Sequence, residues 1–536
     1  MTSGATGMVA CPEPLAAEIG AGILARGGNA VDAGVATAFA QTVANPMMAS
    51  LGGCGHLLVY RADTAAVELI QASPMSGSRA VPGVYEPVAS GAIPGVVGSG
   101  RRVAGDRNLR THAASVIPTL VRGLEEVHRR CGTMPWAALL EPSIALARDG
   151  LVVTPYLYET WDPFLPHPMG VQPSEKIEAE PGARAIFMPE GRLLRVGERL
   201  VQRDLARTLE RVARDGARVF YDGEIGEQIG RDFEAHGGLF TTDDLRDAAP
   251  TLGTPTSARY RDCTFVTDAP PGLGVILLLI MQVLEGIDVR SLGWNSPAYL
   301  DVVARTMQWA LAEAAGVLTA GSPNGAAALL DPARVASVRD RVARGEFSAA
   351  SGAAPAREGT THLAIVDRAR NAVSWVHSSG SGSGVVTPGL GFVHNDHMIM
   401  FDPHPGRLAS LAPRTVPVHG GGPVIILRSG RPWMAIGSPA GALKTTALTQ
   451  VLLAVLEFGL PLQAAISSPR IHTQHESRTV MVESNFPSGL ARALGRLGHR
   501  VVVSDYRARV SAVMLSQDGD LVGGADPRGG GGLEWI

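Results

Sequence analysis

A change in sequence character at the Gly359-Thr360 step constrains the fold of this chain more than any other feature. Residues 321–357 are rich in Ala, Gly, Ser and Arg, which is typical of a linker, and the alternating run at 363–366 is typical of a strand. Helical patterns dominate before the linker, whereas strands and glycine-rich turns dominate after it. We therefore expect an α+β fold in which two antiparallel sheets pack between layers of helices.

Thr360 follows a flexible glycine and stands directly before the expected strand. If the Gly359–Thr360 peptide bond is cut, Thr360 becomes an N-terminal residue that carries a hydroxyl nucleophile and its own free amine as the base. The alternative interpretation is a loop that ends in a threonine-rich strand, because β-branched residues suit strands. Taken alone, residues 358–362 favour the loop. The choice between a loop and a threonine nucleophile therefore depends on the rest of the sequence.

Composition narrows the class of function. The chain has 536 residues, which is too long for one small core and predicts two lobes or one large domain with intimate halves. Its formal net charge is −3 and only 5% of its residues are aromatic, so we expect a small-molecule or peptide substrate and no nucleic-acid partner. The four cysteines form no CxxC pair, and we expect neither a disulfide framework, a metal nor another cofactor.

The sequence shows no targeting or membrane-spanning segment. The N-terminal residues lack the basic region and apolar core of a signal peptide. The longest apolar run, residues 275–281, is too short to cross a bilayer. We therefore expect a cytoplasmic protein without a membrane partner.

Several separate blocks resemble, in the same order, those of the gamma-glutamyltranspeptidase family. The N-terminal blocks are Met8-Val9-Ala10, Gly27-Gly28-Asn29-Ala30-Val31-Asp32-Ala33 and Leu51-Gly52-Gly53-Cys54-Gly55. The later blocks are Gly132-Thr133-Met134-Pro135, Ala147-Arg148-Asp149-Gly150, Gly237-Gly238-Leu239, Thr360-Thr361-His362, Asn371-Ala372-Val373, Gly437-Ser438-Pro439, Pro469-Arg470-Ile471-His472 and Asp526-Pro527-Arg528. Several blocks in the same order along nearly the whole chain indicate the family far more specifically than any single block does.

The resemblance implies an N-terminal-nucleophile hydrolase with a four-layer αββα sandwich. It also implies one precursor that cuts itself at Gly359–Thr360 into two subunits that stay together as a heterodimer, with higher oligomers left open. The large, helix-rich subunit would be residues 1–359, ending in a mobile linker at about 321–359, and the small, strand-rich subunit would be residues 360–536. In the cleavage step, Thr360 Oγ attacks the preceding carbonyl, an ester forms by an N-to-O shift, and water releases the new amine.

The resemblance also assigns roles to residues around Thr360. Ser378 stands where the family usually has a second threonine that contacts the nucleophile, and its hydroxyl can form the same hydrogen bond. Ala440 and Gly441 match the pair whose backbone N–H groups form the family's oxyanion hole. Alanine in place of glycine is harmless there because only the amide is used.

The expected substrate-binding residues depart from the family pattern. The family grips the alpha-carboxylate of glutamate with an arginine, but the corresponding stretch here, residues 70–75, contains neither Arg nor Lys. Further departures around the expected pocket are Gly380 in a shortened loop, His397, Met400, His419 and Gly420. An ordinary gamma-glutamyl group is therefore expected to bind poorly.

Such a pattern is similar to specialised family members of 4-alkylproline antibiotic biosynthesis, which hydrolyse a carbon–carbon bond beside a keto acid. By this interpretation the enzyme serves intracellular secondary metabolism, Thr360 attacks a ketone, and histidines help to hold the leaving enolate. Candidate histidines are His362, His377, His394, His397 and His419. The alternatives are a gamma-glutamyl hydrolase or transferase, an acylase for another amide, and a processed but inactive binding protein.

Overall fold

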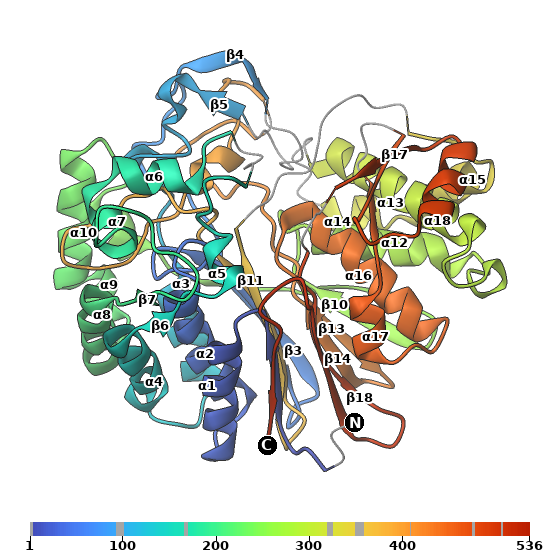
Figure 1. The fold of residues 1–536 in the computed structure, drawn as a ribbon, viewed down its shortest axis with the longest axis horizontal. Coiled ribbons are helices and arrows are strands. Elements are labelled where there is room, and N and C mark those ends of the chain that lie inside the picture. Colours follow the sequence, from blue (N-terminus) through green and yellow to red (C-terminus); the bar gives the residue numbers. More distant parts are fainter. Residues whose placement is uncertain are drawn as a thin grey trace.

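The computed structural model describes residues 4–92, 101–165, 170–318, 325–348, 359–407, 409–473, 478–504 and 508–536. Two antiparallel sheets face each other at the centre, and helices cover the outer face of each (Figure 1). This is the four-layer αββα sandwich that the sequence predicted. In the part of the chain that is described, no helix is long and apolar enough to cross a membrane.

The first sheet has seven strands and holds the Thr360 segment at its middle. Its strands, in spatial order, are β20 (Gly532–Trp535), β1 (Met8–Cys11), β11 (Thr361–Val366), β12 (Ala372–Ser378), β2 (Cys54–Arg61), β3 (Ala66–Ala72) and β8 (Thr251–Gly253). Strand β11 begins at the residue after Thr360 and pairs on one side with β1 and on the other with β12. Thr360 is therefore anchored by a strand with neighbours on both sides.

The second sheet has six strands and also combines segments from both sides of Thr360. Its spatial order is β19 (Leu521–Ala525), β18 (Ser511–Leu515), β14 (Arg431–Gly437), β13 (Val424–Arg428), β10 (Cys263–Thr267) and β9 (Thr256–Tyr260). Smaller sheets consist of β15 (Ile471–Thr473), β16 (Thr479–Val482) and β17 (Arg500–Val503), of β4 (Pro87–Ala92) and β5 (Arg101–Val103), and of β6 (Leu151–Val152) and β7 (Arg199–Leu200).

Alternation along the strands builds the layers, because successive side chains point to opposite faces of a sheet. In β1, Val9 packs into the core under the helices, whereas Met8 packs into the core between the sheets. The same alternation places Ile365 of β11 on the helix side and Ala364 on the sheet side. Both faces of these strands are buried, which explains why their sequences are nearly continuous apolar runs.

One layer of helices covers the first sheet. Its principal members are α1 (Pro14–Ala25), α2 (Ala30–Ala44), α3 (Leu120–Cys131), α4 (Trp136–Asp149), α8 (Arg203–Asp215) and α10 (Glu224–Ala235). Helix α2 is buried along its whole length and starts with a capping box between Asn29 and Asp32. A Cβ atom at Gly34 would lie 2.7 Å from the ring of Trp375, so only glycine lets α2 approach β12 this closely.

The other layer of helices covers the second sheet. It consists of α12 (Gly274–Glu285), α13 (Pro297–Leu318), α14 (Gly325–Leu329), α15 (Pro332–Ala343), α16 (Gly441–Leu456), α17 (Leu462–Ser467) and α18 (Ser488–Arg496). The remaining short helices are α5 (Pro155–Tyr158), α6 (Pro173–Ala179), α7 (Pro181–Phe187), α9 (Arg218–Tyr221) and α11 (Thr242–Asp247), with 3-10 turns at Ala104–Asp106, His112–Ala114, Arg290–Leu292 and His397–Met400.

Part of the expected linker at about 321–359 is helical. Residues 325–348 form α14 and α15, followed by a turn at 344–345 and three residues without regular structure. Val335, Val338 and Val342 recur every three to four residues, so they share one face of α15 and pack into the core of the second helix layer. The remainder of the expected linker, residues 321–324 and 349–358, lies outside the described residues.

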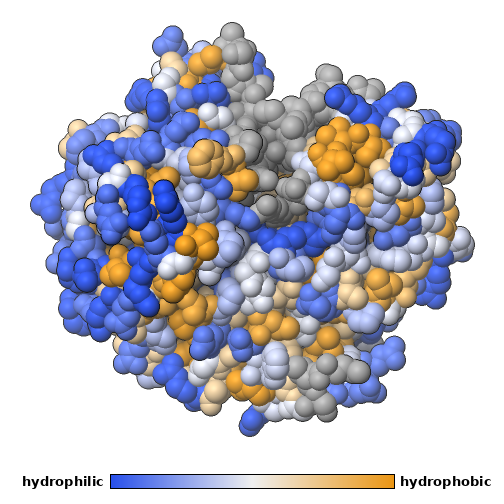
Figure 2. Space-filling model, viewed as in Figure 1, coloured by the Kyte–Doolittle hydropathy of each residue, from blue (hydrophilic) through white to orange (hydrophobic). Residues whose placement is uncertain are grey.

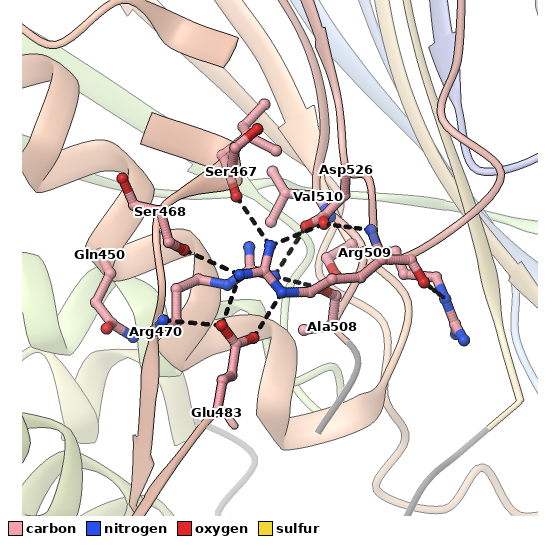
Figure 3. Close-up of polar contacts among 12 residues, drawn as sticks. Gln450, Ser467, Ser468, Arg470, Glu483, Ala508, Arg509, Val510 and Asp526 are labelled. Atoms are coloured by element: carbon pink, nitrogen blue, oxygen red, sulfur yellow. Dashed lines mark hydrogen bonds and ion pairs between the residues drawn. The ribbon is translucent and has the colours of Figure 1, made fainter. Parts of the chain in front are cut away.

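A buried ion network ties the C-terminal segments together (Figure 3). Arg470 Nη2 lies 2.8 Å from Asp526 Oδ2, and the backbone N–H of Arg470 donates to Glu483 over 3.1 Å. Arg528 contacts both acids, at 2.6 Å from Glu483 Oε1 and 3.0 Å from Asp526 Oδ1. Although burial favours the neutral acid, Arg470 and Arg528 hold the pKa of Asp526 below its ordinary value. The network fixes β15, β16 and β19 relative to one another.

The face of the molecule seen in Figure 1 is largely hydrophilic (Figure 2). Hydrophobic residues form small separate patches on it, as is usual for the surface of a globular protein. The functional residues described next are instead buried inside the molecule, between segments of both sheets.

Candidate active site

Two hydroxyl groups meet at the carbonyl group of the peptide bond that is expected to be cut. Thr360 is almost buried, with 7% of its surface exposed, and its Oγ1 donates to the Gly359 carbonyl oxygen over 2.7 Å. Ser378 ends β12 and donates its own hydroxyl to the same oxygen over 2.5 Å. The two hydroxyl oxygens are 3.2 Å apart. Antiparallel pairing of β11 with β12 creates this convergence.

Ser378 Oγ has a proton-donating neighbour on each side. It accepts from the backbone N–H of Gly380 over 2.9 Å, and His397 Nε2 lies 3.3 Å away. Because the single proton of Ser378 goes to the Gly359 carbonyl, His397 Nε2 is assigned as the protonated nitrogen. His397 Nδ1 then accepts from the Cys54 thiol, whose sulfur is 3.2 Å away.

Burial sets the charge state of this chain of hydrogen bonds. Burial lowers the pKa of His397 to about 4, an effect that Asp396 opposes, so the imidazole is neutral at pH 7. Burial also raises the pKa of the Cys54 thiol, which therefore keeps its proton. The arrangement orients Ser378 through neutral hydrogen bonds and places no net charge beside Thr360.

A pocket of about 610 Å³, partly open to solvent, contains these groups. The residues expected from the sequence that line it are Gly359, Thr360, Ser378, Gly380, His397, Met400, His419 and Gly420. Apolar side chains from Pro74, Val376 and Ile399 complete much of the wall. The structure thus brings together these residues, which are up to 346 positions apart, from Pro74 to Gly420.

Ala440 and Gly441, the expected oxyanion-hole pair, do not belong to the described lining of the pocket. They lie where β14 ends and α16 begins, and Ala440 adopts a left-handed conformation with φ of 88°. The first N–H groups of a helix have no partner inside it and carry the positive end of its dipole. Their position at the start of α16 suits an anion-binding role.

A buried ion pair fixes the loop that follows Ser378. Lys176 Nζ lies 2.7 Å from Asp396 Oδ2, and both side chains are almost completely buried. Ser381 donates to the same carboxylate oxygen over 2.7 Å. A Cβ atom at Gly380 would lie 1.7 Å from Asp396 Oδ1, so this loop position excludes any side chain. Lys176 and Asp396 serve each other as counter-ions within the protein.

Two histidines, whose rings are tilted by 32° to each other, form another wall of the pocket. The rings of His56, in β2, and His419 have centroids 4.2 Å apart. His56 Nδ1 lies 3.4 Å from Asp268 Oδ2, just beyond the end of β10. Lys444, in α16, donates to the carbonyl groups of Gly420 and Gly421.

Both histidines of this wall are neutral at physiological pH. Burial and then the charge of Lys444 lower the pKa of His56 to about 3. Burial, followed by His56 and Lys444, also lowers the pKa of His419. Burial raises the pKa of Asp268 to about 6, an effect that Lys444 opposes. The wall is therefore polar without carrying a cationic imidazole.

Sequence reasoning named His419 but missed its neighbours. His56 directly follows the glycine cluster at 51–55, which was the one local signal for it. Asp268 and Lys444 carry no local signal, because they reach the site only through the folding of the second sheet and α16. Cys54, Lys176 and Asp396 were also missed.

Three other histidines from the sequence analysis are held by the scaffold. His362 Nε2 is 3.0 Å from Ser374 Oγ, and His394 Nε2 is 3.0 Å from Thr387 Oγ1. His377 borders the pocket, but its Nε2 is 2.8 Å from Gln41 Oε1. These contacts give the three rings a structural role in strand and loop packing.

Residues 16–535 match the sequence model of the family described as gamma-glutamyltranspeptidase. The chain belongs to this family. It is 29% identical over 547 residues to a glutathione hydrolase proenzyme of Escherichia coli (strain K12), a match that covers 97% of this chain and 90% of the relative. It is 32% identical over 536 residues to the Acylase ACY 1 proenzyme of Pseudomonas sp. (strain SE83), covering 98% of this chain and 92% of the relative.

Solved structures agree with this assignment. The cephalosporin acylase of Bacillus halodurans superposes with a TM-score of 0.81 at 26% identity, covering 99% of this chain and 96% of that one. A structure titled LmbA2991T421A gives a TM-score of 0.85 at 24% identity, covering 99% and 98% of the two chains, and supports the fold alone. The gamma-glutamyltranspeptidase-like chain is thus a hydrolase with the N-terminal-nucleophile fold.

Proposed function

We propose that this chain is a proenzyme that cuts its own Gly359–Thr360 bond and then uses Thr360 to hydrolyse an amide whose acyl group is not gamma-glutamyl. The convergence of the Thr360 and Ser378 hydroxyls on the Gly359 carbonyl oxygen is the observation that carries the proposal. The names of the related proenzymes support a precursor that matures. Residues 1–359 and 360–536 would be the two products, held together as a heterodimer.

This geometry supports self-cleavage. Thr360 Oγ attacks the carbonyl carbon of Gly359, while the Ser378 hydroxyl, already bonded to the carbonyl oxygen, stabilises the negative charge that develops there. The C–N bond breaks, the proton from Oγ passes to the departing nitrogen, and an ester joins Gly359 to Thr360 Oγ. Water then hydrolyses the ester and leaves a carboxyl group on Gly359 and a free amine on Thr360.

The free amine completes the catalytic group for substrate turnover. It accepts the Oγ proton as Thr360 attacks the substrate carbonyl, and returns that proton to the amine that leaves. Water hydrolyses the acyl-enzyme ester and regenerates the hydroxyl. The N–H groups of Ala440 and Gly441, at the start of α16, are our candidates for the donors that stabilise the oxyanion in these steps.

The pocket lining favours an uncharged acyl group. Among the described residues that line it, none is an arginine or a lysine, and Asp396 is already paired with Lys176. An alpha-carboxylate would therefore enter without the bidentate cation that such groups normally require. Met400, Ile399 and Pro74 instead offer apolar contact. The two acylases among the similar proteins support an amide acyl substrate.

A second candidate is hydrolysis of a carbon–carbon bond beside a keto acid, as in 4-alkylproline antibiotic biosynthesis. The same Thr360 would attack a ketone, and the departing carbon would leave as an enolate that must be held and protonated. The neutral pair His56 and His419, whose rings are in contact in the pocket that contains Thr360, favours this candidate because imidazoles can supply such hydrogen bonds.

A denaturing gel tests the processing step. Wild-type protein is expected to give two bands, corresponding to residues 1–359 and 360–536, whereas Thr360→Ala gives one band of 536 residues. A wild-type protein that stays as a single band after long incubation contradicts self-cleavage.

Release of p-nitroaniline tests the substrate class. Processed enzyme is expected to hydrolyse simple acyl p-nitroanilides faster than gamma-glutamyl p-nitroanilide. Rapid turnover of the gamma-glutamyl compound would contradict the assignment. Release of a keto-acid fragment from a diketone, without anilide hydrolysis, would instead select the carbon–carbon candidate.

A further inference from the structure

We propose that His419, held by the contact of its ring with His56, forms a neutral hydrogen-bonding subsite that binds a second carbonyl oxygen in the substrate's acyl group. The preferred substrates would then be oxoacyl compounds rather than plain alkanoyl ones. This inference rests on the proposed amide hydrolysis for its kinetic test, but it also has a binding test that does not depend on turnover.

The proton on His419 can be placed from its contacts. The backbone N–H of Gly421 donates to His419 Nδ1 over 3.2 Å, so Nδ1 carries the lone pair. In a neutral imidazole the proton then lies on Nε2. His419 lines the pocket, is only 4% exposed, and its Nε2 has no hydrogen-bond partner within the described part of the chain. A buried donor left without an acceptor is costly, and a substrate oxygen would satisfy it.

The surroundings of His419 fix this donor in place. Its ring contacts that of His56 at a centroid distance of 4.2 Å and an interplanar angle of 32°. The loop that carries it is tied down by Lys444, which donates to the carbonyls of Gly420 and Gly421, and by the N–H of Gly422, which donates to Asp268 over 2.9 Å. A Cβ atom at Gly421 would lie 2.0 Å from Asp268 Oδ2, so the loop cannot be rebuilt with larger residues. A donor that is held in position loses little entropy on binding.

The local charges favour a neutral acceptor over an anion. The two imidazoles of the wall are uncharged, as is nearby His397, and Asp268 and Lys444 beside them have opposite charges. A carboxylate bound at His419 would be attracted by the positive charge of Lys444 and repelled by the negative charge of Asp268. A ketone oxygen needs only the N–H donor and avoids the desolvation of a full charge.

A metal is a poorer fit to the same residues. His56, Asp268 and His419 have potential ligand atoms within 4.8 Å of one another, all buried. However, a cation there would face the positive charge of Lys444, which already acts on both histidines. Backbone N–H groups also point at His419 Nδ1 and at Asp268 Oδ2, where a cation would need free lone pairs. The geometry therefore favours hydrogen bonding.

The kinetic test compares acyl p-nitroanilides that differ by one oxygen. The pairs are 4-oxopentanoyl with pentanoyl and 5-oxohexanoyl with hexanoyl, and glutaryl p-nitroanilide tests for carboxylate recognition. In wild type, kcat/KM for one oxoacyl compound is expected to exceed that of its alkanoyl partner by about tenfold or more. His419→Phe, which keeps an aromatic ring beside His56, should bring the ratio of oxoacyl to alkanoyl kcat/KM close to one. His419→Gln, which keeps an N–H donor, should restore part of it.

The control is His236→Gln, at an exposed histidine that does not line the pocket, and it should leave the ratio unchanged. The inference is overturned if wild type shows no preference for either oxoacyl compound, if glutaryl is the best substrate, or if His419→Phe keeps the full preference. A processed His419→Phe protein confirms that the variant folds. Loss of the preference on adding EDTA, with recovery in zinc, would also overturn the inference and select a metal site.

The binding test remains decisive if no anilide is hydrolysed. Saturation-transfer NMR on processed enzyme should show stronger binding of 4-oxopentanoate or 5-oxohexanoate than of pentanoate or hexanoate, and the difference should disappear in His419→Phe. Binding preference without anilide hydrolysis would mean that the proposed amide reaction fails while the subsite stands. Anilide hydrolysis with neither a kinetic nor a binding preference for the oxoacyl compounds would mean that the subsite fails while the proposed amide reaction stands.

Discussion

The two sides of the pocket differ in how completely the protein satisfies its own polar groups. On the side of the nucleophile, Thr360, Ser378 and His397 are joined to one another and to the Gly359 carbonyl. On the side of the two histidines, both ring nitrogens of His56 and Nε2 of His419 have no hydrogen-bond partner among the described residues. The first side has the geometry that the proposed self-cleavage uses. The second holds the buried imidazole nitrogen that the proposed subsite uses.

Removing the nucleophile should have the largest effect. Thr360→Ala is expected to stop cleavage and to lower substrate hydrolysis by at least about 10³-fold, because both steps use the same hydroxyl. A denaturing gel and p-nitroaniline release measure the two effects. Thr360→Ser keeps a hydroxyl and should still be processed. Full processing of the alanine variant would show that the convergence at Gly359 does not serve self-cleavage.

Ser378→Ala should have the next largest effect, because it removes the hydroxyl that is bonded to the Gly359 carbonyl. Loss of one such donor typically slows a reaction by about 10²–10³-fold. The half-time of precursor conversion, followed on gels, measures this effect. Ser378→Thr keeps the hydroxyl and provides the matched control. Equal rates for wild type and the alanine variant would show that Ser378 is only a packing residue.

Lys176→Met should destabilise the nucleophile side without touching its hydroxyls. The substitution leaves the buried Asp396 without its counter-ion, which typically costs about 3–5 kcal/mol. Urea unfolding of the unprocessed Thr360→Ala background avoids the complication of two chains. Adding Asp396→Asn should recover much of the loss, since the charge is then removed as well. A double variant no better than Lys176→Met would contradict this explanation.

The pH dependence of stability should be the smallest effect near neutrality. Burial lowers the pKa of His56 and His362 to about 3 and that of His397 to about 4, so the folded state binds fewer protons than the unfolded state below pH 6.5. The free energy of unfolding should therefore fall as the pH is lowered from about 6.5 towards 4. Asp268, with its pKa raised to about 6, acts in the opposite direction over part of that range. Urea titrations at several pH values measure the slope, and a flat profile would contradict neutral buried histidines.

The nucleophile side was the more predictable of the two. Thr360 directly precedes β11, Ser378 ends the neighbouring β12, and both belong to short motifs, so sequence pattern and family resemblance both point to them. The fold class followed from the change from helical to strand patterns. The sequence therefore indicated which residues to examine for the chemistry, and the structure places them around one carbonyl group.

The histidine side was harder to predict because its members come from distant segments. His56 lies in β2, Asp268 follows β10 and Lys444 lies in α16, and only the packing of one sheet on the other brings them together. Lys176 is equally uninformative in sequence, since a lysine in a short polar helix normally faces solvent. Long-range contacts of this kind cannot be predicted from local periodicity or from a short motif.

The order of strands in the first sheet makes the proposed maturation a one-way event. Strand β1, from before Gly359, lies between β20 and β11, from after it, and β2, also from before it, pairs with β12. An intact chain joins these strands by a first-order process, within one molecule. Once the bond is cut, an unfolded enzyme must find its second chain by diffusion, so recovery becomes second-order and competes with aggregation at low concentration. A mature molecule would thus depend on never unfolding, and its lifetime would be set by an unfolding rate instead of an equilibrium.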